Sequence, residues 1–72
     1  MPDPLTIKQL QTLDIIKNYI AKHRVAPTLG EIAFLLDEKS TSTAQYLVGQ
    51  LIVKGFIKHY PDKVRGLEII EK

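Results

Sequence analysis

The sequence contains no cysteine, which excludes disulfide bonds and thiolate metal sites. Its two histidines, His23 and His59, lie far apart and do not have the spacing of metal ligands. It also lacks a long apolar run and an apolar segment near the N-terminus, so it predicts neither a membrane span nor a signal peptide. We therefore expect a soluble cytoplasmic protein that uses no metal or other cofactor and has no membrane partner.

Groupings of catalytic residues are missing too. The sequence has no paired carboxylates, Ser/His/Asp set or metal cluster arranged for chemistry. The histidines are interpreted as structural or solvated side chains. The sequence therefore predicts a binding protein that is not an enzyme and has no small-molecule substrate.

What is present fits one small domain. The chain has 72 residues, of which 44% are hydrophobic and 25% charged, as in a globular protein with a single small core. Its net charge of +2 permits binding to nucleic acid but does not require it. We expect one domain over residues 1–72, in which residues 1–4, with their two prolines, form a mobile arm.

Capping boxes predict the starts of the first two helices. Thr6 and Gln9 have the spacing at which side chains satisfy the free backbone amides of a helix start, and apolar residues then recur at helical spacing. The ring of Pro27 prevents the first helix from continuing further. Thr28 and Glu31 repeat the box, so a second helix is predicted to begin there.

The second and third predicted helices cover Thr28–Leu36 and Ser40–Lys54, with a polar turn between them. Either Ser40 or Ser42 can cap the third helix, and Gly55 suits the left-handed position that ends it. Two short helices joined by a tight turn form a helix-turn-helix, whose second helix can enter the major groove of DNA. The apolar residues expected to face the core from the third helix are Ala44, Leu47, Val48, Leu51 and Ile52.

Two short runs with strand character follow the helices. They cover Phe56–Tyr60 and Gly66–Ile70, and Pro61–Arg65 joins them as a hairpin tip. Three helices followed by two strands predict a mostly α fold with a small β-hairpin. This order is that of a winged helix-turn-helix, in which the hairpin is the wing.

The side of the third predicted helix opposite the apolar stripe is the candidate site. No lysine or glutamate occurs from Thr41 to Val53, whereas an ordinary exposed face usually carries both. Hydroxyl and amide side chains on such a helix can read base edges, and glutamine suits adenine. For Ser40 and Ser42 taken singly, a role as helix caps is at least as good an explanation. The predicted base-facing residues are Ser40, Thr41, Ser42, Thr43, Gln45 and Tyr46.

Contacts to phosphate would position the protein on DNA and supply most of the salt-dependent affinity. Cations cluster from residue 39 onward, and the start of the second helix can offer backbone amides. Each lysine taken singly is better explained as a solvated charge, and Asp37, Glu38 and Asp62 oppose the interpretation because carboxylates repel phosphates. The predicted phosphate-contacting residues are Thr28, Lys39, Lys54, Lys58, Lys63 and Arg65.

From Leu5 to about Ile70 the sequence resembles the N-terminal DNA-binding domain of the LexA repressor family. The motifs that carry the resemblance are Leu5-Thr6 with Gln9, Pro27-Thr28 followed by Glu31-Ile32-Ala33, Lys54-Gly55 and Arg65-Gly66. The resemblance implies a small regulator of transcription, a repressor of the SOS-response type, that binds specific sites on double-stranded DNA. It implies that the residues facing DNA are Ser40, Ser42, Thr43, Gln45 and Tyr46, with Arg65 in the wing. It does not fix the bases, because these residues after Ser40 differ from those typical of the family.

Other positions depart from the family pattern. Asp37 stands where the family often has glycine. The 72 residues end before the C-terminal serine–lysine domain of typical LexA proteins, so we expect no self-cleavage. Phe34 and Leu35 occupy positions where polar residues are expected. We favour packing of Phe34 against the wing or the first helix over a role in a partner surface.

Two functions stay open at this point. The first is DNA binding, and because one recognition helix and one wing cover only a short half-site, we expect a second copy on a palindromic site. The alternative is a winged-helix module that binds protein through the third helix or the Phe34–Leu35 surface. The modest net charge and the acidic turn are compatible with that alternative.

Overall fold

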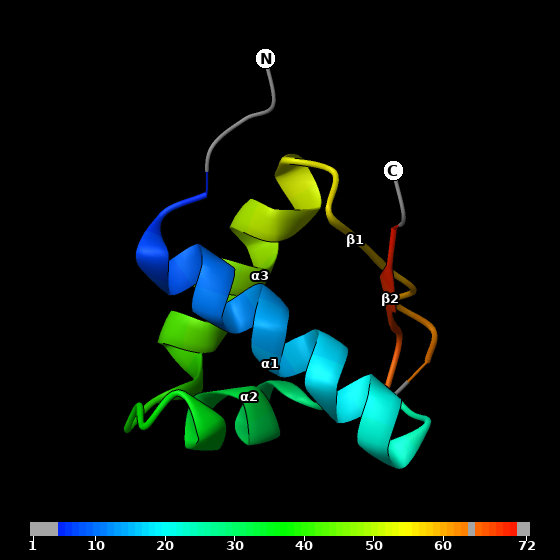
Figure 1. The fold of residues 1–72 in the computed structure, drawn as a ribbon, viewed down its shortest axis with the longest axis horizontal. Helices are drawn as coiled ribbons and strands as arrows, with labels where there is room; N and C mark the ends of the chain where they lie inside the picture. The colour runs from blue at the N-terminus through cyan, green and yellow to red at the C-terminus, as the bar shows by residue number, and fades with distance from the viewer. Residues whose placement is uncertain (1–4, 64, 71–72) are drawn as a thin grey trace.

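The computed structural model describes residues 5–63 and 65–70, and in this part the chain forms three helices followed by an antiparallel hairpin (Figure 1). The expected arm over residues 1–4 lies outside the described residues. No helix in the described part has the length and apolar character needed to cross a membrane. The elements are α1 (Ile7–His23), α2 (Leu29–Leu35), α3 (Thr41–Val53), β1 (Ile57–His59) and β2 (Leu67–Ile69).

The predicted capping boxes are both present. The Thr6 hydroxyl accepts from the Gln9 amide and the Gln9 side chain accepts from the Thr6 amide, each at 3.1 Å. At α2 the Glu31 carboxylate accepts from the Thr28 amide at 2.8 Å, and the Thr28 hydroxyl accepts from the Glu31 amide at 3.2 Å. Because the side chains replace missing helical partners, both helices begin where the sequence predicts.

The turn between α2 and α3 contains Asp37, which stands where the family pattern leads one to expect glycine. Asp37 has φ of 61°, in the left-handed region that glycine adopts without steric cost. Ser40 is the cap of α3, since its hydroxyl accepts from the Ser42 amide at 3.1 Å. At the other end of α3, Gly55 has φ of 84°, as predicted for the residue that ends the helix.

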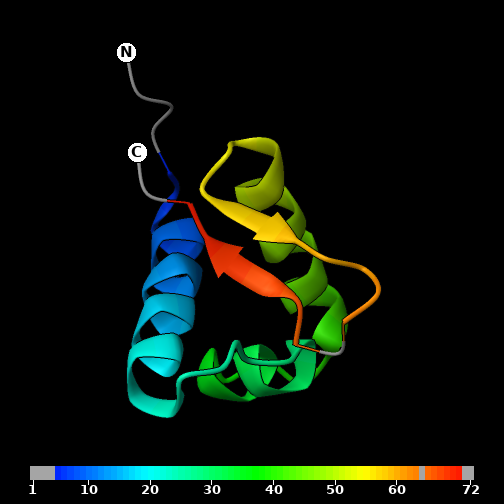
Figure 2. The same cartoon turned by 90° about the vertical axis from the view of Figure 1, so that its right-hand side faces the viewer.

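The core lies where the three helices meet β1, and α3 contributes most to it. Figure 2 shows the hairpin in front, with α1 to its left, α3 to its right and α2 below. Ala44, Leu47, Val48 and Leu51 of α3 are buried and Ile52 is half-buried, which confirms the predicted apolar stripe. Since the core uses this side of α3, the opposite side is left to solvent.

The hairpin is short and tightly closed. Ile57 pairs with Ile69 and His59 with Leu67, so each strand is three residues long and shorter than predicted. The Tyr60 amide donates to the Gly66 carbonyl at 2.7 Å. A Cβ atom on Gly66 would lie 2.2 Å from the Tyr60 carbonyl oxygen, so this position in the hairpin accepts only glycine.

The structure contradicts the expectation for Phe34. Its side chain is 82% exposed and does not pack against the hairpin or α1, and Leu35 beside it is 50% exposed. Ile32 and Ala33 occupy the inner side of the short helix α2, so the next two residues are turned outward. The preference for internal packing was wrong because it gave apolar character more weight than position along the helix.

Candidate nucleic-acid interface

The outer face of α3 consists of exposed residues that carry no charge. Thr41, Ser42 and Gln45 are exposed, and Tyr46 is 64% exposed. Thr43 is half-buried and stands at the side of this face. Ser40 lies just ahead of the helix, where its hydroxyl oxygen accepts from a backbone amide but can still donate its own proton.

A groove of about 590 Å³ runs beside this face, between α3, the start of α2 and the hairpin. Its lining includes Gln45 and Gly49 of α3, Leu29 and Gly30 of α2, and His59 at the end of β1. A Cβ atom on Gly49 would meet nothing within 4 Å, so the backbone of α3 is open to the groove here. Gln45 belongs to both the groove and the outer face, so the two surfaces are continuous.

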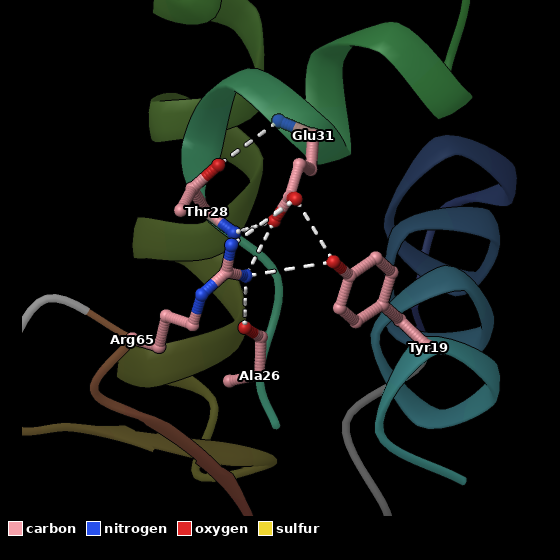
Figure 3. Close-up of polar contacts among 5 residues, drawn as sticks. All are labelled: Tyr19, Ala26, Thr28, Glu31 and Arg65. Atoms are coloured by element: carbon pink, nitrogen blue, oxygen red, sulfur yellow. Dashed lines mark hydrogen bonds and ion pairs between the residues drawn. The ribbon is translucent and has the colours of Figure 1, made fainter. Parts of the chain in front are cut away.

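In the loop that joins the two strands of the hairpin, Arg65 is bonded to three separate parts of the chain (Figure 3). Its Nη1 donates to Glu31 Oε1 at 2.7 Å and to the Ala26 carbonyl at 2.9 Å, and Nη2 lies 3.3 Å from Glu31 Oε2. The Tyr19 hydroxyl donates to Glu31 Oε2 at 2.8 Å. We refer to Tyr19, Ala26, Thr28, Glu31 and Arg65 as the Arg65 cluster.

The Arg65 cluster holds the carboxylate of Glu31 in its charged form. The hydrogen bond from Arg65, with those from the Thr28 amide and the Tyr19 hydroxyl, lowers the pKa of Glu31 from 4.5 to about 2. Both members of the ion pair are partly exposed, with 38% of the Arg65 side chain and 35% of the Glu31 side chain accessible. The pair connects the hairpin to the start of α2, and so fixes one side of the groove.

Sequence reasoning predicted Arg65 as a phosphate-contacting residue but did not find its internal partners. Tyr19 and Glu31 lie 46 and 34 residues away along the chain. Glu31 was assigned only to its capping box, and one of its oxygens does accept the capping hydrogen bond. A cation in the hairpin and a carboxylate at a helix start were visible, but nothing in their spacing indicated that they meet.

The predicted phosphate-contacting lysines fall into two groups. Lys58 and Lys63 come together at the hairpin, where their Nζ atoms lie 5.2 and 5.7 Å from the centroid of the Tyr60 ring. Lys39 and Lys54 stand at opposite ends of α3. The Lys54 ammonium donates to the Gln9 side chain at 3.0 Å, which directs it toward the start of α1.

Two further observations alter the electrostatic picture of this surface. Glu38, which opposed the phosphate interpretation, forms an ion pair with Lys8 at 3.1 Å. Its charge is therefore balanced within the chain. His59 was interpreted as structural or solvated, and the structure places it in the lining of the groove.

Comparison with known proteins identifies the family. A model of the family described as "LexA DNA binding domain" matches residues 2–66. The chain belongs to the LexA DNA-binding domain family. This match confirms the predicted family and its winged helix-turn-helix fold.

Individual relatives of this LexA-family chain are LexA repressors. The chain is 42% identical over 66 residues to the LexA repressor of Shewanella frigidimarina (strain NCIMB 400), a match that covers 92% of this chain and 32% of that protein. It is 41% identical over 71 residues to the LexA repressor of Finegoldia magna (strain ATCC 29328 / DSM 20472 / WAL 2508), covering 99% and 34%. The chain spans about a third of the length of these relatives.

Proposed function

We propose that this chain binds specific sites on double-stranded DNA and serves as the DNA-binding part of a LexA-like repressor. The observation that carries the proposal is the outer face of α3, which is exposed, uncharged and rich in hydroxyl and amide groups. The second helix of a helix-turn-helix enters the major groove, where such groups read base edges. The names of the relatives support the same function.

In this proposal Gln45 is the principal base reader, because its amide is exposed and can pair bidentately with adenine. A bidentate pair of this kind supplies about 1–3 kcal/mol of discrimination between bases. Tyr46 packs on a sugar or base or contacts a phosphate. The hydroxyl residues at the start of α3 complete the base-facing set: Ser40, Thr41, Ser42 and Thr43.

The phosphate contacts of the proposal surround the groove and the hairpin. Lys58 and Lys63 lie together at the hairpin, and Thr28 lines the groove. The bonds of Arg65 to described residues run from Nη1 and Nη2, so its Nε–H is available for a phosphate. Lys39 and Lys54 would reach phosphates beyond the two ends of α3.

We further propose that two copies bind one palindromic site. A single module of this kind buries about 600–1,000 Å² on DNA, which is small for selecting one site in a genome. Two copies would place their recognition helices about 34–36 Å apart, or a multiple of that distance. Because its proposed ligand is chromosomal DNA, we place the protein in the cytoplasm at the nucleoid.

Selection of bound duplexes from a random DNA pool tests the proposed function. We expect a recurrent sequence motif, and we expect the affinity for the selected duplex to fall steeply as salt is raised. Failure to enrich any sequence would contradict specific binding. Sedimentation then tests assembly: we expect a monomer without DNA and two copies on a palindromic duplex. A stable dimer without DNA, or only one copy on the palindrome at saturating protein, would contradict the assembly proposal.

A further inference from the structure

Among the residues that the structure describes, His59 is the one titratable side chain in the lining of the groove. The neighbouring core residue Ile57 is 1% exposed, and side chains alternate along a strand, so His59 shares its side of the hairpin with Ile57. His59 itself is exposed, because it lies beyond the edge of the core. It therefore projects over the groove, across which lie Gln45 and Gly49 of α3.

We infer that one phosphate of the DNA backbone occupies this groove and accepts a hydrogen bond from the His59 imidazole. The inference rests on the proposed function, because the groove is continuous with the outer face of α3 through Gln45. When a helix lies in the major groove, the sugar–phosphate strands pass along its sides. On this side of α3 the strand would run between the helix and the hairpin, over the open backbone at Gly49.

The charges around His59 favour an anion in the groove. Across the hairpin it faces Leu67, α3 presents Gln45 and Ile52, and the start of α2 presents Thr28 to Gly30, none of which is charged. Lys58 and Glu68 pair with each other in the strand register and belong to the opposite side of the hairpin. Glu31 and Arg65 are bonded to each other. Among the described residues of the lining, a phosphate would therefore meet one side chain that can become positively charged and no carboxylate.

This placement couples DNA binding to a proton. Histidine is the side chain whose charge ordinarily changes between about pH 5 and 8. A protonated imidazole adds a positive charge to the hydrogen bond with phosphate, so the complex takes up a proton and is tighter at the acidic end of that range. The bond also adds one neutralised phosphate, and this increases the dependence of affinity on salt.

The test compares the chain with two variants, H59Q and H23Q, on a duplex selected from a random pool. Glutamine keeps a hydrogen-bond donor and removes the charge. His23 is the matched control, because it is the other histidine and its ring packs against Tyr19, with centroids 4.2 Å apart, outside the groove. Circular dichroism checks that each variant is folded before dissociation constants are measured at several salt concentrations, near pH 5.5 and near pH 8.

For the unaltered chain and for H23Q we expect affinity to be about tenfold higher near pH 5.5 than near pH 8, the scale of one charged hydrogen bond. We expect the salt slope of both proteins to be steeper at the acidic pH by about 0.9, the value for one more phosphate. For H59Q we expect neither difference. A pH dependence that survives in H59Q would overturn the role of His59 and leave the proposed function standing. Absence of DNA binding by the unaltered chain at either pH would overturn both.

A second experiment, in which the phosphates of the duplex are neutralised one at a time, identifies the phosphate that His59 contacts. Replacing single phosphates of the duplex by neutral methylphosphonates should reveal one position at which the unaltered chain loses clearly more affinity near pH 5.5 than H59Q does, because glutamine offers the phosphate a donor without a charge. Additive losses at every position would overturn the inference, because two groups in direct contact cannot lose the same interaction twice.

Discussion

Gly49→Ala is expected to stabilise the fold and to weaken DNA binding at the same time. Gly49 lies inside α3, where glycine costs about 0.5–1 kcal/mol relative to alanine. The added Cβ would meet nothing within 4 Å, so no clash offsets this gain. For a domain of this size the change corresponds to a rise in Tm of roughly 2–8 °C. In the DNA complex, however, the same methyl group would project into the space proposed for the sugar–phosphate strand of the DNA.

Thermal and urea unfolding measure the first effect, and fluorescence anisotropy with a selected duplex measures the second. Crowding a close contact costs about 1–3 kcal/mol, so we expect the affinity to fall about tenfold. Gly66→Ala is a control with the opposite expected effect on stability, because its Cβ would lie 2.2 Å from the Tyr60 carbonyl oxygen. That variant should lose about 2–4 kcal/mol of stability, from overpacking and a broken hydrogen bond. A Gly49→Ala chain that is more stable and binds DNA as before would refute the placement of DNA over α3 at this point.

The remaining predictions concern Gln45, Arg65 and Glu31. Gln45→Ala should weaken binding to the selected duplex far more than to random DNA, by about 1–3 kcal/mol of base discrimination, and an equal loss on both would remove Gln45 from the base readers. Arg65→Ala should weaken binding to all duplexes alike and lower the salt slope by the value of about one phosphate contact. A fall in Tm with an unchanged salt slope would show that Arg65 holds the hairpin in place but does not contact a phosphate. Because the pKa of Glu31 is lowered to about 2, its ion pair stabilises the fold fully above pH 4.5 and is lost as the pH falls toward 2. Glu31→Gln keeps a capping side chain, so its stability, followed by urea unfolding, should fall less over that range than that of the unaltered chain; equal falls would show that Glu31 does not carry this dependence.

The order of elements could be predicted because each signal is local. Thr6 and Thr28 begin helices through partners three residues away, and Gly55 ends α3 through its own backbone angle. The apolar stripe of α3 is likewise a pattern within one helix. Once the buried side of the helix is known from this stripe, the exposed side is known as well. This is why the exposed side of α3 could be predicted from the sequence, although Thr43, one of the predicted base-facing residues, is half-buried.

The features that sequence reasoning missed all depend on contacts between distant segments. Arg65 meets Glu31 and Tyr19 only after the hairpin has folded back on α1 and α2. The groove has walls from three elements, so the position of His59 in it could not be read from the spacing of either histidine. The outward direction of Phe34 depended on which side of the two-turn helix α2 meets the core, and so short a helix gives a weak periodic signal.

The Arg65 cluster has a consequence for how this domain could be re-engineered. Its members lie on α1, in the segment before α2, at the start of α2, and at the hairpin, and none lies on α3 (Figure 3). The outer residues of α3 could therefore be exchanged as a block without disturbing the bonds that hold the hairpin in place. A hairpin grafted from another protein would, in contrast, need an arginine at position 65 and glycine at position 66 to be held in the same way. In the proposed function, the residues of α3 that would read bases are therefore separate from those that hold the hairpin in place, and new target sequences would be sought by changing α3 alone.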